Sequence, residues 1–390
     1  MSSTLGHGLD LPKSIDQRAR ERFVSSFRAY ILNDLAGQLR DDYEANVAPE
    51  LGVPQGGVEV HRALLGRESF ARYSSLRCAA QEMVWRSVIE EVEGAADHLQ
   101  GAFRKVTETP KGSLKLDPAL KLPRYYDRVD VHLMPGNYQG RGEVDDLAPG
   151  AIYDNGFNVF AFGAMGRQHN DIGMSMANFA RLRFPGLRPR VVVDVGCTIG
   201  HNTLPWKQVF PEAEVHGIDA SAACLRYAHG RAESLKVAAH FRQGLSSSLA
   251  FADSSVDVVF SSMFLHELPP EEIRAFLKEA HRVLRPGGIM LHMELPPNGA
   301  LAPFDAFYLD WDSYYNNEPH YKEFRDLDYQ TLCIEAGFAK DDFFQSVMPR
   351  YTYVSEQDFS RAIGLDAKFD ADTGRLSDSI QWFGFGAVRQ

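Results

Sequence analysis

The sequence predicts an α/β fold: a Rossmann-like, doubly wound, mostly parallel sheet in the second half of the chain, preceded by a mainly helical first half. From Arg190 onward, short apolar runs alternate with helical stretches, a pattern typical of βαβ units around a parallel sheet. The apolar runs are VVVDV (191–195), VHGID (215–219), VDVVFSS (256–262) and GIMLHMEL (288–295). Helices are expected between these runs, near 201–209, 221–236 and 270–284.

The first half of the chain has a helical pattern. Phe23, Phe27, Ile31 and Leu35 recur at spacings of four and therefore share one helical face, which predicts helix over 15–46. Other segments are expected as follows: helix over 58–92, 95–106 and 171–184, and an irregular connector over the proline-rich 109–138. The resulting division is a mainly helical region (1–150), a lead-in segment with a helix (151–187) and the α/β region (188–390).

Length, charge and cysteine usage narrow the class of protein. A chain of 390 residues suggests two domains, and a net charge of -11 argues against nucleic acid as a partner. No apolar stretch approaches the roughly 20 residues that span a bilayer, and the first residues lack the apolar core of a secretory signal. The four cysteines are scattered, without a C-x-x-C pair. We therefore expect a cytoplasmic protein with no membrane partner.

A glycine loop follows the first strand of the α/β region. The strand ends in Asp194-Val195-Gly196-Cys197-Thr198-Ile199-Gly200 and leads into a helix, whose first N–H groups can face a ligand. Asp219 ends the next strand, 23 residues after Gly196, where a carboxylate can accept both hydroxyl protons of a ribose. The alternative is that Asp219 caps the helix that starts at Ser221. Loop and acid together predict a nucleoside cofactor site, and the loop is not the G-x-G-x-x-G of nicotinamide-binding folds.

The region from Arg188 to Gln390 resembles the class I S-adenosylmethionine-dependent methyltransferases. Five landmarks occur in the family's order: Asp194–Gly200, HGIDAS (216–221), LAFADSSVDVVFSSMFLHEL (249–268), EAHRVLRPGGIMLHMEL (279–295) and LDYQTLCIEAGF (327–338). The resemblance implies a seven-stranded sheet and S-adenosyl-L-methionine as cofactor. The first half resembles no family.

The resemblance also implies which residues bind the cofactor. They are Asp194, Gly196, Cys197, Thr198, Gly200, Asp219, Ala220, Leu245, Ser246 and Ser262. Thr198 replaces the family's middle glycine, and Leu245 stands where many members carry an acid that binds the adenine amino group. Segments 129–140 and 152–163 have unusual aromatic and Gly/Asn content, and we expect one of them to reach the cofactor cleft, with Tyr153 as the residue concerned.

Methyl transfer requires mainly that acceptor, methyl group and sulfur be aligned, and a protonated acceptor also needs a base. His266 follows the fourth strand at the edge of the sheet where ligands bind, and its ordinary pKa suits proton removal near neutrality. In the aromatic O-methyltransferases that this region resembles, a histidine at this landmark is the base. A packing or hydrogen-bonding role for His266 is the alternative, and Glu267 could either orient it or respond to the following helix dipole.

An aromatic insertion over 296–329 is expected, by resemblance, to shape the acceptor pocket. The predicted acceptor contacts are Phe264, Phe304, Phe307, Tyr308, Trp311 and Tyr315. The alternative is that the insertion buries the sheet edge or docks the helical region. The helical region itself is expected to bind substrate, form a lid or build a homodimer.

No metal site is expected. Three D-x-D pairs occur without a histidine or third acid nearby in sequence, and we interpret them as solvated acids: Asp310/Asp312, Asp326/Asp328 and Asp370/Asp372. The predicted function is methyl transfer to oxygen or nitrogen of a small molecule, for example a secondary metabolite. The rivals are a cofactor-binding protein without methyl transfer (a lyase, cyclase or regulatory module) and a nicotinamide-dependent oxidoreductase.

Overall fold

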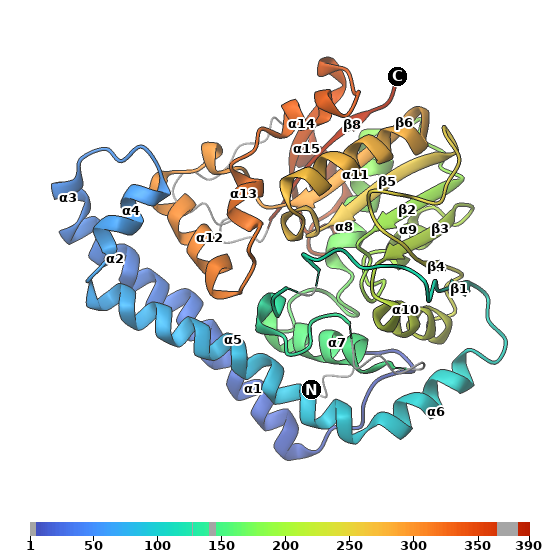
Figure 1. Ribbon diagram of the computed structural model, residues 1–390, viewed down its shortest axis with the longest axis horizontal. Helices are drawn as coiled ribbons and strands as arrows, with labels where there is room; N and C mark the ends of the chain where they lie inside the picture. The colour runs from blue at the N-terminus through green and yellow to red at the C-terminus, as the bar shows by residue number, and fades with distance from the viewer. Residues whose placement is uncertain (1–4, 127, 140–145, 365–380) are drawn as a thin grey trace.

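The computed structural model describes residues 5–126, 128–139, 146–364 and 381–390 (Figure 1). Within them, one sheet of eight strands has the order β1-β4-β3-β2-β5-β6-β8-β7. Each pair among the first six strands of this order is parallel, and β8 runs antiparallel to both β6 and β7. The strands are β1 (Ser113–Lys115), β2 (Val191–Val195), β3 (Glu214–Asp219), β4 (His240–Gln243), β5 (Val256–Ser262), β6 (Leu284–Glu294), β7 (Phe343–Pro349) and β8 (Gln381–Val388).

The predicted fold class is confirmed, with one addition to the sheet. Strands β2 to β8 are the seven that the resemblance implies, and β1 is an eighth, supplied by the first half of the chain. It pairs parallel with the edge strand β4, with Ser113 opposite His240. The expected irregular connector therefore contains a strand, but three residues are too few to show an alternating pattern.

Helices cover both faces of the sheet, which explains why its central strands are apolar on both sides. Neighbouring residues of one strand enter different cores: Val193 packs with the helices of one face and Val192 with those of the other. The first face is covered by α11 (Pro270–Val283) and α14 (Tyr329–Glu335). The second is covered by α8 (Asp171–Arg183), α9 (Leu204–Val209) and α15 (Glu356–Ile363), while α10 (Ala222–Ser234) packs on β4.

The helical region begins with one continuous helical run over 15–46, where the spacing left open whether the segment forms one helix or two. It comprises α1 (Ile15–Tyr30), a π-helical turn η1 (Ile31–Leu35) and α2 (Ala36–Asn46). The stretch expected over 58–92 is two helices, because Gly66, with φ +87°, turns the chain between them. The remaining helices here are α3 (Ala48–Leu51), α4 (Gly57–Leu64), α5 (Glu68–Gly94), α6 (Ala96–Val106) and α7 (Ala148–Phe160).

Helix α5 is the long bridge of the molecule, visible in Figure 1 as the diagonal beside α1. Its 27 residues span roughly 40 Å at 1.5 Å per residue. One part of it packs with α12 (Pro303–Tyr315), and another packs with α7. The helical region thus contacts the α/β region directly through α5 and α12, and at a second place through α7, which packs on α10 (Ala222–Ser234).

Helix α7 was not predicted, and the expected domain boundary at residue 150 falls inside it. The glycines of α7 explain both why the sequence did not predict this helix and how closely it packs against its neighbours. A Cβ atom at Gly150 would lie 2.4 Å from Tyr227 of α10, and one at Gly156 would lie 2.4 Å from Trp85 of α5. Glycine lowers helix propensity, but here it lets α7 fit closely between the two regions.

The described residues also include α13 (Tyr321–Arg325) and short 3₁₀ turns. These turns are η2 (Val131–Leu133), η3 (Leu265–Glu267), η4 (Asn298–Ala300), η5 (Lys340–Asp342) and η6 (Tyr351–Tyr353). Within the described ranges, the helices fall short of the length and hydrophobicity that a bilayer span requires.

Candidate active site

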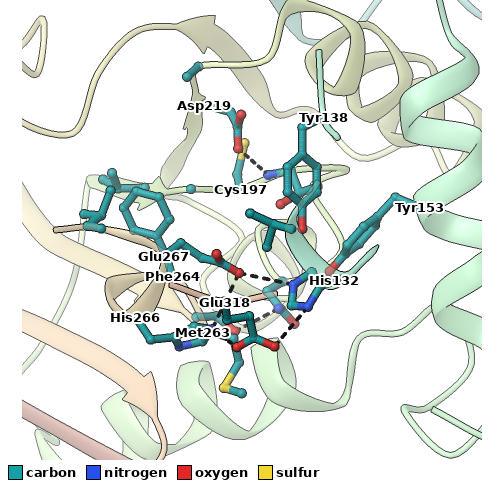
Figure 2. A pocket seen from close by; sticks show the side chains of 18 of the residues that line it. His132, Tyr138, Tyr153, Cys197, Asp219, Met263, Phe264, His266, Glu267 and Glu318 are labelled. Atoms are coloured by element: carbon teal, nitrogen blue, oxygen red, sulfur yellow. Dashed lines mark hydrogen bonds and ion pairs between the residues drawn. The ribbon is translucent and has the colours of Figure 1, made fainter. Parts of the chain in front are cut away.

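A cavity of about 360 Å³ opens at the carboxyl ends of β2, β3 and β5. This edge of a parallel sheet is where open α/β folds bind their ligands. One part of the wall comes from the loops that follow these three strands. Another part comes from both segments singled out in the first half: Val131, His132, Asn137 and Tyr138, together with Tyr153, Phe157, Phe160 and Ala161. Figure 2 shows Tyr138 and Tyr153 facing the side chains of the α/β region.

The glycine loop lines the cavity through Gly196, Cys197 and Thr198. Gly196 has φ +78°, and a Cβ atom there would lie 2.3 Å from the Phe264 ring. Thr198 has φ +47°, in the left-handed region that glycine adopts most easily. This backbone conformation explains why the family pattern has glycine at Thr198 and shows that the departure costs local strain.

Asp219 lies beside the loop at the end of β3. Its Oδ2 accepts a hydrogen bond from the Thr198 N–H at 2.9 Å, and its Oδ1 accepts one from the Ser221 N–H at 2.8 Å. The side chain of Ser221 itself caps α10 by accepting from Cys224 N–H, so Asp219 is not the cap of that helix. A carboxylate has about four acceptor positions, so two remain for a ligand's hydroxyl groups.

The structure brings nearly all predicted cofactor residues to this cavity. Those that line it are Asp194, Gly196, Cys197, Thr198, Asp219, Ala220, Leu245, Ser246, Ser262 and Tyr153. Gly200 does not line it, and a Cβ atom there would lie 2.9 Å from the Phe241 ring of β4. Asp194 accepts from the Thr203 hydroxyl at 2.6 Å, and burial raises its pKa to about 7.

His266 lies in the same cavity and is almost completely buried, at 3% exposure. Its Nδ1 lies 2.6 Å from Oε2 of Glu294, at the end of β6, while Oε1 of Glu294 accepts from the Phe264 and Leu265 N–H groups. Glu294, and not Glu267, therefore fixes the imidazole. Burial opposes the charge on His266, but Glu294 outweighs it and the pKa is raised to about 9.

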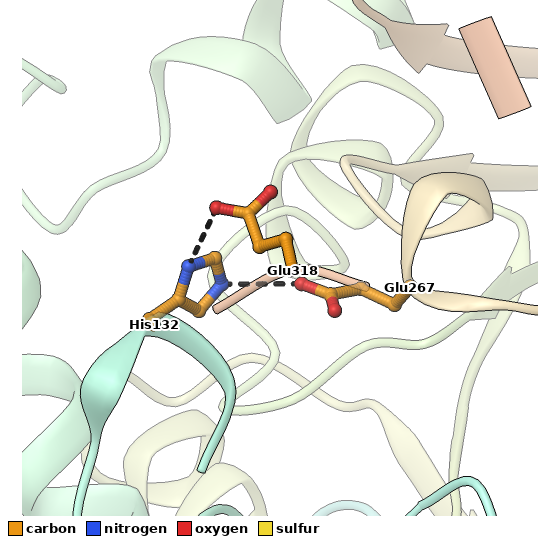
Figure 3. Close-up of side chains that lie close together, drawn as sticks. All are labelled: His132, Glu267 and Glu318. Atoms are coloured by element: carbon orange, nitrogen blue, oxygen red, sulfur yellow. Dashed lines mark ion pairs between the residues drawn. The ribbon is translucent and has the colours of Figure 1, made fainter. Parts of the chain in front are cut away.

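A second imidazole, His132, lies opposite His266. Its Nε2 is 3.1 Å from Glu267 Oε1 and its Nδ1 is 3.2 Å from Glu318 Oε1 (Figure 3). Burial opposes its charge, but Glu318 and Glu267 outweigh burial and raise the pKa of His132 to about 10. In Figure 2 these groups gather at one end of the drawn side chains and Asp219 lies at the other.

Sequence reasoning missed His132, Glu294 and Glu318. Glu294 did carry a signal, since it is an acid ending an apolar strand, where only a partnered carboxylate is stable. His132 stands in the proline-rich connector, and Glu318 stands in the loop between α12 and α13. Neither is part of a motif, because only the packing of distant segments brings them together.

Five of the six predicted acceptor contacts lie outside the cavity, which corrects the expectation for the aromatic insertion. Of the six, Phe264 lines it. Phe304, Phe307, Tyr308 and Trp311 pack instead against the helical region, with residues of α2, α4 and α5. Tyr315 contacts the Trp311 ring, with centroids 5.8 Å apart. The physical reason is that α12 needs its apolar face to dock α4 and α5, the alternative considered for this segment.

The D-x-D pairs are not simply solvated, which is a second correction. Asp310 pairs with Arg325 at 2.8 Å, and Asp312 pairs with the buried Arg77 at 2.5 Å. Asp328 caps α14. Asp370 and Asp372 lie outside the described residues.

The sheet order and the cavity at the strand ends define the class: a Rossmann-like α/β domain with its ligand cavity at the carboxyl edge of the sheet. Residues 192–288 match the family model described as a methyltransferase domain. This segment of the second half therefore carries a methyltransferase domain, which confirms the predicted resemblance to methyltransferases.

Two relatives of known name each match about a third of the chain. The chain is 34% identical over 143 residues to malonyl-acyl-carrier-protein O-methyltransferase 1 of Coxiella burnetii, covering 35% of this chain and 47% of that protein. It is 35% identical over 121 residues to the malonyl-acyl-carrier-protein O-methyltransferase of Hahella chejuensis, covering 31% and 40%. A solved putative O-methyltransferase from Nostoc punctiforme is 17% identical, with 64% of each chain covered and a TM-score of 0.42. The chain spans about half the length of the curated relatives it matches, or less.

Proposed function

We propose that this protein transfers a methyl group from S-adenosylmethionine to an oxygen or nitrogen of a small molecule held in the cavity. The observation that carries the proposal is that the predicted cofactor residues and the candidate bases line the same cavity. The Thr198 loop and Asp219 lie in the same cavity as His266 and the carboxylate Glu267. A cofactor held by its ribose at Asp219 can thus present its methyl group to an acceptor beside these groups.

The chemistry needs alignment first and proton removal second. The acceptor atom forms a bond to the methyl carbon as the carbon–sulfur bond breaks, leaving adenosylhomocysteine, and the acceptor's proton passes to a base. Glu294 binds Nδ1 of His266 and leaves Nε2 for this role. With a pKa raised to about 9 by Glu294 against burial, His266 must first lose its own proton, so Glu267 is the second candidate for the base.

The relatives favour oxygen as the methylated atom, because their names describe O-methyltransferases. Those names also specify an acyl-carrier-protein substrate, which makes a carrier-bound acyl group the second candidate acceptor. The buried, mixed aromatic and charged wall fits a free metabolite better. Methyl transfer from labelled S-adenosylmethionine to free hydroxy-aromatic and carboxylic acids, compared with malonyl-carrier protein, separates the two.

Calorimetry tests the cofactor assignment before any acceptor is known. We expect adenosylhomocysteine to bind with one site per chain and NAD to show no measurable binding. The reverse result would identify a nicotinamide-dependent enzyme. Binding of adenosylhomocysteine with no transfer to any acceptor tested would favour a cofactor-binding protein that has lost transfer.

Replacement of His266 by Ala tests the base. If His266 accepts the proton, kcat falls by about a hundredfold while the affinity for adenosylhomocysteine changes little. Glu267→Gln is the matched comparison within the cavity, and the base is the residue whose replacement abolishes the fall of kcat at acidic pH. A loss below about threefold for His266→Ala rules that residue out.

A further inference from the structure

The cluster around His132 joins three segments that are far apart in the sequence. His132 comes from η2 of the first half, Glu267 from η3 after β5, and Glu318 from the loop between α12 and α13. One side-chain ligand atom from each lies within 4.8 Å of the other two. The two carboxylates approach the imidazole at different nitrogens: Glu267 lies 3.1 Å from Nε2 and Glu318 lies 3.2 Å from Nδ1 (Figure 3).

The charges of the cluster call for a cation. Glu267, Glu318 and Glu294 meet here, and within the described ranges their ion pairs all run to His132 and His266. Glu294 is fully buried and Glu318 nearly so. Three carboxylates outnumber two imidazoles, so a net negative charge remains even when both imidazoles are protonated, and buried charges are normally paired or bound to a metal.

Surrounding groups hold the cluster rigid. The His132 carbonyl accepts hydrogen bonds from Gln81 Nε2 at 2.9 Å and Trp85 Nε1 at 2.6 Å. These bonds secure His132 in a left-handed conformation, with φ 57° and ψ 16°, that costs a non-glycine residue energy. Asn316 Nδ2 donates to Glu318 Oε1 at 2.8 Å. Outer hydrogen bonds of this kind orient the ligands of metal sites.

We propose that His132, Glu267 and Glu318 bind a divalent transition-metal ion of the Zn²⁺ or Mn²⁺ type. An imidazole ligand favours these ions over Mg²⁺ and Ca²⁺, which prefer oxygen throughout. Three protein ligands leave coordination positions for a further oxygen, as in catalytic metal sites. Because all three residues line the cavity, that oxygen belongs to the acceptor; this use of the ion rests on the proposed function, whereas the binding of the ion does not.

Metal titration of the chelator-treated full chain tests the site. We expect wild-type protein to bind one Zn²⁺ or Mn²⁺ per chain by calorimetry and elemental analysis. Glu318→Gln and Glu267→Gln should each weaken binding by roughly a hundredfold, because each replaces a charged ligand of nearly identical shape. Glu323→Gln, on α13 and exposed, is the control and should bind as wild type does.

Absence of binding of both ions, or equal affinity in wild type and Glu318→Gln, would overturn the proposal. If the glutamine variants fail to fold, electron paramagnetic resonance of Mn²⁺-loaded wild type decides: nitrogen coupling from an imidazole supports the site, and its absence contradicts it. Adenosylhomocysteine calorimetry on the same metal-free protein keeps the two proposals separate. Nucleoside binding without metal binding removes this inference alone, and metal binding without nucleoside binding removes the proposed function alone.

Discussion

The two ends of the cavity are built in different ways. The cofactor end is local: Gly196, Thr198 and Asp219 lie within the 192–288 segment that matches the methyltransferase domain, each next to a strand end. The other end combines His266 and Glu267 of that segment with three residues outside it, His132, Glu294 and Glu318, which come from separate parts of the chain. The comparison teaches that the domain supplies the place for the cofactor, while the chemistry around the acceptor depends on how the helical region is docked.

The largest expected effect concerns this docking. Asp154 of α7 is fully buried and accepts from His7 Nε2 at 2.8 Å and the Tyr227 hydroxyl at 2.9 Å, with Arg231 Nε at 3.8 Å. Asp154→Asn removes the negative charge that faces the buried Arg231 guanidinium. This substitution should lower the free energy of unfolding by about 3–5 kcal/mol. Urea unfolding measures this loss, and Asp41→Asn, exposed on α2, is the control.

The same substitution has a pH signature. Burial opposes the charge on Asp154, but His7, His169 and Arg231 outweigh burial and hold the pKa of its carboxyl well below the usual range. A carboxyl whose pKa is lower in the folded than in the unfolded state contributes its full stabilisation of the fold above about pH 4, the ordinary pKa of an aspartate. The protein loses this contribution as the pH falls through the pKa of the folded state. The difference between wild type and Asp154→Asn should thus be constant near neutrality and shrink below about pH 4. A difference that grows on acidification would contradict this assignment.

The next effect separates packing from substrate contact. Phe307 of α12 is 1% exposed and packs against Phe70, with ring centroids 5.6 Å apart. Phe307→Ala should lower the free energy of unfolding by about 3 kcal/mol and leave adenosylhomocysteine affinity unchanged. Tyr314→Ala, exposed on the same helix, is the control and should change neither the free energy of unfolding nor this affinity. If Phe307→Ala left the stability unchanged and raised the KM for the acceptor, the aromatic insertion would line the acceptor pocket after all.

The smallest of these effects tests whether the two ends of the cavity act separately. Asp219→Ala removes the acceptor of the ribose hydroxyl groups and should weaken adenosylhomocysteine binding by about a hundredfold, measured by calorimetry. Zn²⁺ affinity should stay the same, because Asp219 lies at the opposite end. Glu214→Gln, at the start of the same strand and exposed, is the control. Loss of both affinities together would show that the ends form one coupled site.

The sequence was sufficient for most of the fold and for the cofactor end, because both depend on short-range patterns. The alternation of strands and helices predicts the sheet, and Asp219 follows Gly196 at a spacing that the βαβ geometry dictates. Helix α7 was not predicted because its glycines are explained by close packing against Tyr227 and Trp85, which are distant in sequence. His132 escaped for the same reason: its place depends on Trp85 and Gln81 of another helix.

A crystal structure of the protein with adenosylhomocysteine is the most direct test of the central claim, that one cavity joins a nucleoside cradle to a cluster of imidazoles and carboxylates. The account predicts both ribose hydroxyl groups within hydrogen-bond distance of Asp219 and the sulfur directed toward His266 and Glu267. A nucleoside bound away from Asp219, or one whose sulfur points away from that cluster, would contradict it.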